Sequence, residues 1–167
     1  MDNEKFLERY DGQSTDELIA LAGSYRIDSL VLAFEEAIQQ KATSKAISTE
    51  EMNVLAVEAL EREVNNGGYS QFFLNSSNQF AGSIVRALQA IACPKTALIT
   101  EDAINALDLE GKLTPEALEG VISGDDEQVQ EKLNACDDRY YANTESIEDR
   151  LFEWIKENRS HIEVRNG

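Results

Sequence analysis

The fold is decided by a stretch near the middle of the chain, EVNNGGYSQFFLNSS at residues 63–77. The residues before it are typical of an amphipathic helix, and the double glycine at 67–68 interrupts that helix because glycine readily adopts the left-handed conformation of a helix end. The short element that follows buries Tyr69, Phe72 and Phe73, and each such aromatic ring can bury about 150–250 Å². The pattern predicts a helix, a break and a short aromatic element that anchors the core.

The polar residues of this stretch are expected to satisfy backbone groups at its turns. We therefore interpret the whole stretch as a structural motif, made of Asn66, Gly67, Gly68, Tyr69, Gln71, Phe72, Phe73 and Asn75. The alternative is a small-ligand-binding or immunity-type helical domain, with a groove lined by Tyr69, Gln71, Phe72 and Asn75. A phosphate-binding loop is not expected, because the stretch 63–77 around the glycines contains no lysine or arginine.

Outward from this stretch the apolar spacing is helical almost throughout, and no long alternating run predicts a strand. Two capping boxes mark helix starts, Ser14 with Glu17 and Ser48 with Glu51. The two prolines, Pro94 and Pro115, fit the first turn of a helix, where a missing N–H is harmless. With 167 residues, the chain is predicted to form one compact all-α domain of several helices over residues 1–167.

Several individual helices are predicted from these signals. The segment 27–38 is assigned to a helix, although its first residues have some strand character, and further helices are expected over residues 80–93, from Pro94, from Pro115 to about Ile122, from about Asp126 to Tyr141, and over 146–158. No internal repeat, low-complexity tract or linker is found. These boundaries place most of the acidic residues on short helices and on the turns between them.

Charge is the unusual feature of the composition. The chain has 32 Asp and Glu against 15 Lys and Arg, a formal net charge of −17. The electrostatic field of a surface with this much negative charge repels phosphate backbones and anionic lipid headgroups. Direct binding to nucleic acid or to a membrane is therefore not expected. We expect any partner recognised by charge to be basic.

The negative charge is concentrated in the second half of the sequence. Residues 101–153 have a net charge of −12, against −6 for residues 1–100 and +1 for residues 154–167. Carboxylates about 5–6 Å apart on helices can imitate the phosphate path of DNA, and the alternative is a merely acidic surface. The residues expected to bind a partner are Glu101, Asp102, Asp108, Glu110, Glu116, Glu119, Asp125, Asp126, Glu127, Glu131, Asp137, Asp138, Glu145, Glu148 and Asp149.

Catalytic and metal chemistry find little support in the sequence. Cys93 and Cys136 form no CxxC pair, and the one histidine, His161, is predicted to be exposed near the C-terminus. No nucleophile has an evident base, so we expect no catalytic residues, no bound metal, no cofactor and no enzymatic activity. The N-terminus lacks a signal-peptide pattern and no apolar run could span a membrane, which favours a cytoplasmic location.

The motif Asn-Gly-Gly-aromatic-x-Gln-Phe-Phe-x-Asn-Ser at residues 66–76 resembles a bacterial family of acidic DNA-mimic proteins of the Neisseria type, a domain formerly of unknown function. The helix that carries Glu58, Glu61 and Glu63 precedes it, an Ala-Ile-rich segment at 87–92 follows it, and the likeness extends over about residues 30–155. The resemblance implies an all-helical fold, a homodimer, and an acidic face that occupies the DNA-binding surface of a helix-turn-helix transcription factor. It assigns no individual acidic residue to that face.

Overall fold

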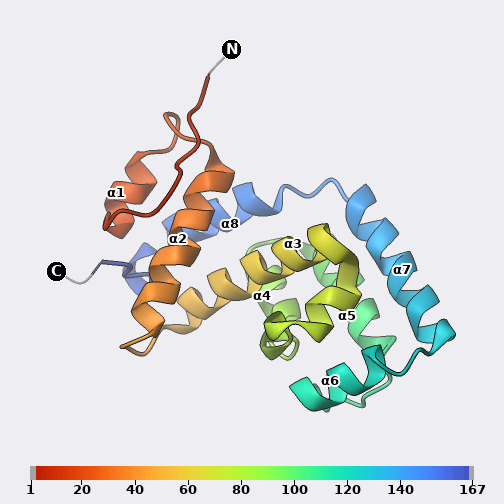
Figure 1. Cartoon of the computed structure of the whole chain (residues 1–167). Coiled ribbons are helices and arrows are strands. Elements are labelled where there is room, and N and C mark those ends of the chain that lie inside the picture. Colours follow the sequence, from red (N-terminus) through yellow and green to blue (C-terminus); the bar gives the residue numbers. More distant parts are fainter. Residues whose placement is uncertain (1–2, 166–167) are drawn as a thin grey trace. The chain divides into compact units, whose positions relative to one another are not determined.

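The computed structural model describes residues 3–165, and this part of the chain is all-α, as predicted, with no strand. It forms eight α-helices and two short 3-10 helices (Figure 1). Their bounds are α1 (Thr15–Ala20), α2 (Ile27–Ala42), α3 (Thr49–Leu74), η1 (Ser76–Phe80), α4 (Ile84–Ala90), α5 (Pro94–Asn105), α6 (Pro115–Ile122), α7 (Glu127–Ala142), α8 (Ile147–Glu157) and η2 (Arg159–His161).

The predicted helix starts are confirmed by their hydrogen bonds. Ser14 accepts from the amide of Glu17 while the Glu17 carboxylate accepts from the amide of Ser14, which completes a capping box before α1. Ser48 and Glu51 exchange the same two bonds before α3. Thr114 caps α6 through the amide of Ala117. Each bond satisfies a backbone N–H that has no partner inside its helix.

One predicted helix is shorter than expected. Instead of a helix over residues 80–93, the structure has the 3-10 helix η1, a turn, and α4 only from Ile84 to Ala90. The hydroxyl of Ser77 donates to the carbonyl of Phe72, and the side-chain amide of Asn78 donates to the carbonyl of Phe73. These side chains satisfy carbonyls at the end of α3 and hold the following residues in a tight turn, which delays the next helix.

The structure consists of two compact units, and the division falls inside α3, between Glu58 and Ala59. The described part of unit 1 comprises residues 3–58 and 146–165, where α2 packs against α1 and α8 (Figure 1). The C-terminal segment from Ile162 to Val164 is held by hydrogen bonds to Tyr10 and Thr15. Whether the chain acts as one domain stays a prediction.

Unit 2 comprises residues 59–145, where α5 packs against α4 and α7, and α6 packs against η1. Its core contains the aromatic rings of the sequence motif. Tyr69, Phe72 and Phe73 are fully buried. The rings of Phe72 and Phe73 meet edge to face with centroids 5.4 Å apart, and Tyr140 from α7 meets Tyr69 in the same way at 5.9 Å. The prediction that these aromatics anchor the core is confirmed.

Candidate functional site

The predicted partner-binding carboxylates lie mostly in unit 2. Thirteen of the fifteen belong to α5, α6, α7 and the turns that precede and follow these helices. The remaining two, Glu148 and Asp149, lie on the first turn of α8 in unit 1. The structure therefore assigns the predicted set to two units, and the candidate site is built from the thirteen residues of unit 2.

Nine of these thirteen carboxylates are exposed and form no hydrogen bond or ion pair with any residue between 3 and 165. We call this set the open carboxylates: Glu101, Asp108, Glu110, Glu116, Glu119, Asp125, Glu127, Glu131 and Asp138. Their oxygens are hydrated and available to a cationic partner. An exposed charge that already has a protein partner would have to give up that interaction before it could bind another molecule.

Three of the open carboxylates form a row along α7. Glu127, Glu131 and Asp138 are spaced by four and then seven residues, so they lie on the same face of the helix. At a rise of 1.5 Å per residue, the axial steps are about 6 Å and about 10 Å. Duplex DNA carries a phosphate about every 3.4 Å along each strand. One face of α7 therefore carries negative charge at the spacing of about every second to third phosphate.

The charge within unit 2 is strongly uneven. Residues 59–100, which form the end of α3, α4 and the start of α5, have a net charge of +1. Residues 101–145 have thirteen acidic and three basic side chains, a net charge of −10. The negative charge of this unit is thus confined to the end of α5, α6, α7 and their connections.

Two further predicted residues hold helices in place. Asp126 is the N-cap of α7, and its carboxylate accepts from the amides of Gln128 and Val129. Asp102, on α5, forms an ion pair with Arg139 of α7, with 2.7 Å between Oδ2 and the guanidinium nitrogen. Both are partly or fully exposed, but their carboxylates already have protein partners.

Glu145 caps α5 from fifty residues away in the sequence. Its carboxylate accepts from the amides of Lys95 and Thr96 at 2.8 and 2.9 Å and from the Thr96 hydroxyl at 2.7 Å. Partial burial acts to raise the pKa of Glu145, but the hydrogen bonds from Thr96 and Lys95 outweigh it and hold the pKa below its ordinary value. The ionised carboxylate therefore satisfies the first amides of a helix whose N-cap residue, Cys93, makes no side-chain capping hydrogen bond.

Asp137 is bound to the double glycine of the sequence motif. Its Oδ1 accepts from the amide of Tyr69 at 2.8 Å. Gly68 has φ +78° and ψ −177°, a conformation essentially reserved for glycine, and a Cβ at this position would collide with the Asp137 carboxylate. Burial raises the pKa of Asp137, the Tyr69 amide opposes that rise, and the neighbouring Asp138 adds to it. Asp137 thus joins α7 to the break in α3.

The other polar residues of the motif are joined to Glu63. Its Oε2 accepts from the side-chain amides of Gln71 at 2.8 Å and Asn75 at 2.9 Å, across the break in α3. A Cβ at Gly67 would collide with the side chain of Gln71. The pattern of polar residues and glycines is explained by this local packing, with Asn66 exposed at the surface of the kink.

The Tyr69 ring is the centre of the motif. Its hydroxyl shares a 2.8 Å hydrogen bond with the hydroxyl of Thr100, which is also buried. Burial raises the pKa of Tyr69 and keeps the phenol neutral. The residues proposed to line a ligand groove are accordingly either fully buried, as are Tyr69 and Phe72, or hydrogen-bonded to Glu63.

Cysteine, histidine and clustered acidic residues offer no further site. Cys93 and Cys136 are buried thiols, and burial raises the pKa of Cys136. His161 is exposed in η2. Among residues 3–165, no group of three or more His, Cys, Asp or Glu side chains is arranged to hold a metal ion.

A comparison with protein families matches residues 45–158 to a family described as DMP19-like protein. The chain belongs to the DMP19-like family. The matched segment contains the motif at 63–77 and all fifteen predicted carboxylates. No curated protein and no solved structure matches the chain.

The family match begins after α2 and ends at the C-terminal boundary of α8, so it includes all of unit 2 and part of unit 1. The matched residues therefore include the kinked α3, the aromatic core and the acidic segment.

None of the described helices is both long and apolar enough to cross a membrane.

Two structural residues were not recognised as such from the sequence. Asp137 and Glu145 were predicted to bind a partner, yet their carboxylates accept hydrogen bonds from residues 68 and 50 positions away. No local pattern marks either role, because the N–H groups concerned come from distant segments. For Asp137, the sequence offered one indication. A double glycine indicates that another group approaches the backbone closely, and here that group is the Asp137 carboxylate.

Proposed function

We propose that this protein is a non-enzymatic DNA mimic that binds the DNA-binding surface of a helix-turn-helix transcription factor and prevents it from binding DNA. The observation that carries the proposal is the set of nine open carboxylates in unit 2. They are exposed, have no partner among the described residues, and lie in a segment with a net charge of −10.

The binding energy would come from the same source as that of DNA. A DNA-binding surface carries Lys and Arg side chains that neutralise phosphates, and the carboxylates on α7 offer negative charges along a rod-like element. Both acidic and basic surfaces collect counterions, and their release on association favours binding at low salt. The affinity should therefore fall steeply as the salt concentration rises.

Keeping these charges together has a cost that supports a functional role. Glu127 and Glu131 are four residues apart on α7, and Glu116 and Glu119 are three apart on α6. Each like-charge pair of this kind destabilises a helix by about 0.2–0.5 kcal/mol. Solubility requires a net charge of only about 2–8, so the excess is better explained by a basic partner.

Membership of the DMP19-like family supports the same function. The motif within residues 63–77 resembles that of acidic DNA-mimic proteins, and this resemblance implies DNA mimicry. The proposal includes three further points: the partner is of the helix-turn-helix class, the protein forms a homodimer, and it is located in the cytoplasm. The resemblance implies the first two, and the sequence favours the third. The alternative, a ligand groove around the motif, would require access to Tyr69 and Phe72, which are fully buried. The packing of the motif therefore favours the mimic.

The proposal is tested by reversing charge on α7. The variant Glu127→Lys/Glu131→Lys/Asp138→Lys changes three open carboxylates. The control variant Glu4→Lys/Glu8→Lys/Glu157→Lys makes the same change in net charge at exposed positions of unit 1 that have no partner within residues 3–165. Each protein is immobilised and used to capture proteins from the cytosol of its host at low salt, and the captured protein is then competed with duplex DNA.

The wild type and the control should retain a DNA-binding protein that duplex DNA and high salt both release. The α7 variant should bind it about 100-fold more weakly, since each reversed charge at a cationic surface costs about 1 kcal/mol. Mimicry by this face would be wrong if the α7 variant bound as tightly as the control, or if duplex DNA failed to compete.

A further inference from the structure

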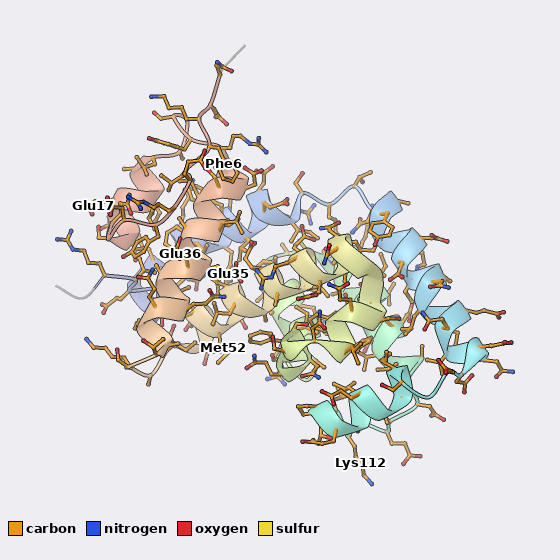
Figure 2. All side chains as sticks on the ribbon, in the orientation of Figure 1. Phe6, Glu17, Glu35, Glu36, Met52 and Lys112 are labelled. Carbon is orange, nitrogen blue, oxygen red and sulfur yellow. The ribbon has the colours of Figure 1, made fainter. Side chains whose placement is uncertain are left out.

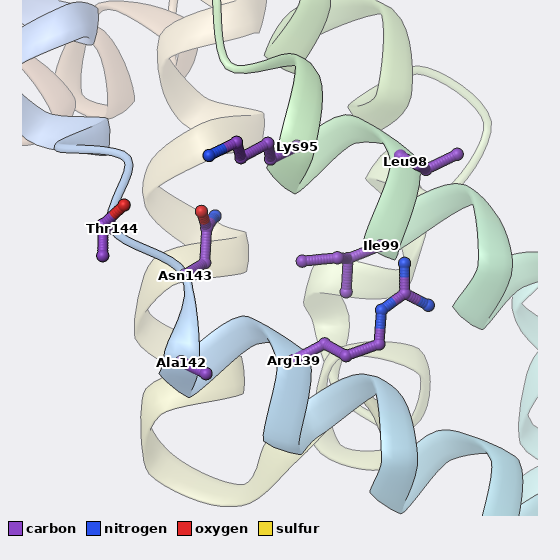
Figure 3. Close-up of a pocket in the computed structure, with 7 residues that line it drawn as sticks. All are labelled: Lys95, Leu98, Ile99, Arg139, Ala142, Asn143 and Thr144. Carbon is purple, nitrogen blue, oxygen red and sulfur yellow. The ribbon is translucent and has the colours of Figure 1, made fainter.

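Unit 2 contains a pocket that is lined by two basic residues and by no acidic residue. It lies between α5 and the end of α7, has a volume of about 350 Å³, and is drawn in Figure 3. This volume is near the lower end of the range for small-molecule sites, about 300–1,000 Å³. The pocket lies entirely within residues 59–145, so its walls belong to one unit.

Two cationic side chains line this pocket. Lys95, from α5, and Arg139, from α7, are two of only six basic residues in the unit. In Figure 3 the ammonium of Lys95 lies beside Asn143 and Thr144, and the guanidinium of Arg139 lies near Ile99 and Leu98. The Lys95 ammonium has no partner among the described residues. Because the unit has a net charge of −9, two basic residues in the lining of one pocket are unusual.

The wall between the two cations is apolar. Ile99 and Ala142 line it together with Leu98, a large aliphatic side chain that is 54% exposed. An exposed leucine beside a lysine and an arginine forms an amphipathic surface, on which a ligand could bury hydrocarbon while its anionic end remains near a cation. The hydrogen-bonding groups of Asn143 and Thr144 lie at the Lys95 end.

The pocket is held in shape before any ligand binds. Asn143 donates its side-chain amide to the Thr96 hydroxyl at 2.7 Å, and the Glu145 carboxylate binds the first amides of α5. Asp102 binds one nitrogen of the Arg139 guanidinium. A guanidinium has five N–H donors, so this ion pair orients Arg139 and leaves donors for a ligand. Preformed sites lose less conformational entropy on binding.

We infer that this pocket binds a small organic anion with one carboxylate and an apolar chain. The carboxylate would bind the Lys95 ammonium, and the chain would lie against Ile99, Ala142 and Leu98, toward Arg139. A single negative charge is favoured because the field of the unit opposes the entry of multiply charged anions such as inorganic phosphate. The inference does not depend on DNA mimicry, since no open carboxylate lines this pocket.

The test is an NMR titration of the ¹⁵N-labelled full chain with hexanoate, with the neutral hexanamide and inorganic phosphate as comparisons. Hexanoate should shift saturably the amides around Lys95, Ile99 and Asn143, whereas hexanamide and phosphate should bind at least tenfold more weakly. Shifts that lie elsewhere, equal binding of hexanamide, or no saturable shifts with hexanoate would overturn the inference.

Matched variants separate the two parts of the site. Lys95→Gln should weaken hexanoate about tenfold through the loss of a charge-assisted hydrogen bond, and Leu98→Ser should weaken it through the loss of apolar contact. Lys112→Gln is the control, because Lys112 is exposed and points away from the ribbon in Figure 2. Backbone amide spectra of each variant report whether the fold is kept. Equal weakening by Lys112→Gln would indicate a general charge effect and contradict the assigned pocket.

Discussion

The two units have almost the same net charge, −8 for unit 1 and −9 for unit 2, but they differ in where the carboxylates without a protein partner lie along the chain. In unit 1 many carboxylates pair with a neighbouring base or a backbone amide. Ion pairs there join Lys41 to Glu51, Arg26 to Asp28, Lys156 to Glu153, Arg159 to Asp16 and Arg165 to Glu17. Carboxylates without such a partner occur in both units, but among the described residues of unit 1 they are dispersed along the chain, as at Glu4, Glu8 and Glu157, whereas in unit 2 all nine lie between residues 101 and 138.

This difference shows that net charge alone does not identify a binding surface. A carboxylate that is already neutralised by a base contributes to the stability of the fold and little to long-range attraction. A carboxylate without a partner keeps its full charge and is available to another molecule. The candidate site is therefore defined by carboxylates that lack partners and lie close together along the chain, and the following predictions test which carboxylates are structural in each unit.

The largest effect is expected from the buried ion pair of unit 1. The Glu51 side chain is 1% exposed and accepts from Lys41 at 2.8 Å and from the amide of Glu163 at 2.9 Å. Glu51→Gln should lower the free energy of unfolding by about 3 kcal/mol, because it leaves the Lys41 ammonium without its counter-charge. Urea denaturation measures this. A loss below about 1 kcal/mol, typical of an exposed pair, would contradict the assigned role.

A smaller effect is expected where an acidic residue of unit 2 is structural. Asp137→Ala should cost about 1–2 kcal/mol, because the Tyr69 amide loses its acceptor. Asp137→Asn should cost much less at neutral pH, since its carbonyl oxygen can still accept that bond and no charge is buried. If both variants are equally unstable in urea, the ionised carboxylate is required and the explanation in terms of an amide acceptor is wrong.

Asp137 also predicts the direction in which the stability of the protein changes with pH. The pKa of Asp137 is higher in the folded protein than its ordinary value of 3.8, so the folded state binds this proton more tightly. Its contribution to stability should fall as the pH rises above 3.8 through the folded pKa. Subtracting the unfolding curves of Asp137→Asn from those of the wild type across this range isolates the contribution.

Glu145 should show the opposite pH dependence. Its folded pKa is below the ordinary value of 4.5, so the cap that it forms on α5 should be present above pH 4.5 and lost as the pH falls through the folded pKa. Glu145→Gln should lower stability at neutral pH by about 1 kcal/mol and flatten the acid side of the profile. An unchanged acid limb in thermal unfolding would show that the cap does not depend on the charge.

The smallest effect, and the one of opposite sign, is expected for an open carboxylate. Glu131→Gln removes the repulsion with Glu127 on α7 and should stabilise the protein by about 0.2–0.5 kcal/mol while weakening binding to the proposed partner. Chemical denaturation and the capture assay measure the two quantities on one variant. A loss of stability would indicate that Glu131 has a structural role like those in unit 1.

Local hydrogen bonds and spacing account for what could be predicted from the sequence. The capping boxes at Ser14 and Ser48 and the cap at Thr114 involve residues three positions apart. Both residues of each hydrogen bond therefore belong to one short sequence pattern that can be recognised without the structure. The helix over 80–93 was predicted too long because Ser77 and Asn78 bind carbonyls at the end of α3, a competition that apolar spacing does not report.

The sequence by itself determined the all-helical class, most helix starts, the kink at the double glycine and the excess of acid after residue 100. Only the tertiary structure decided which of those carboxylates have protein partners. Asp137 and Glu145 accept hydrogen bonds from backbone amides of segments far away along the chain. It also brought Lys95 and Arg139 to one pocket. The physical reason is that helix propensity and capping act between neighbours, whereas the pairing of a charge depends on every group that folding brings within hydrogen-bonding distance.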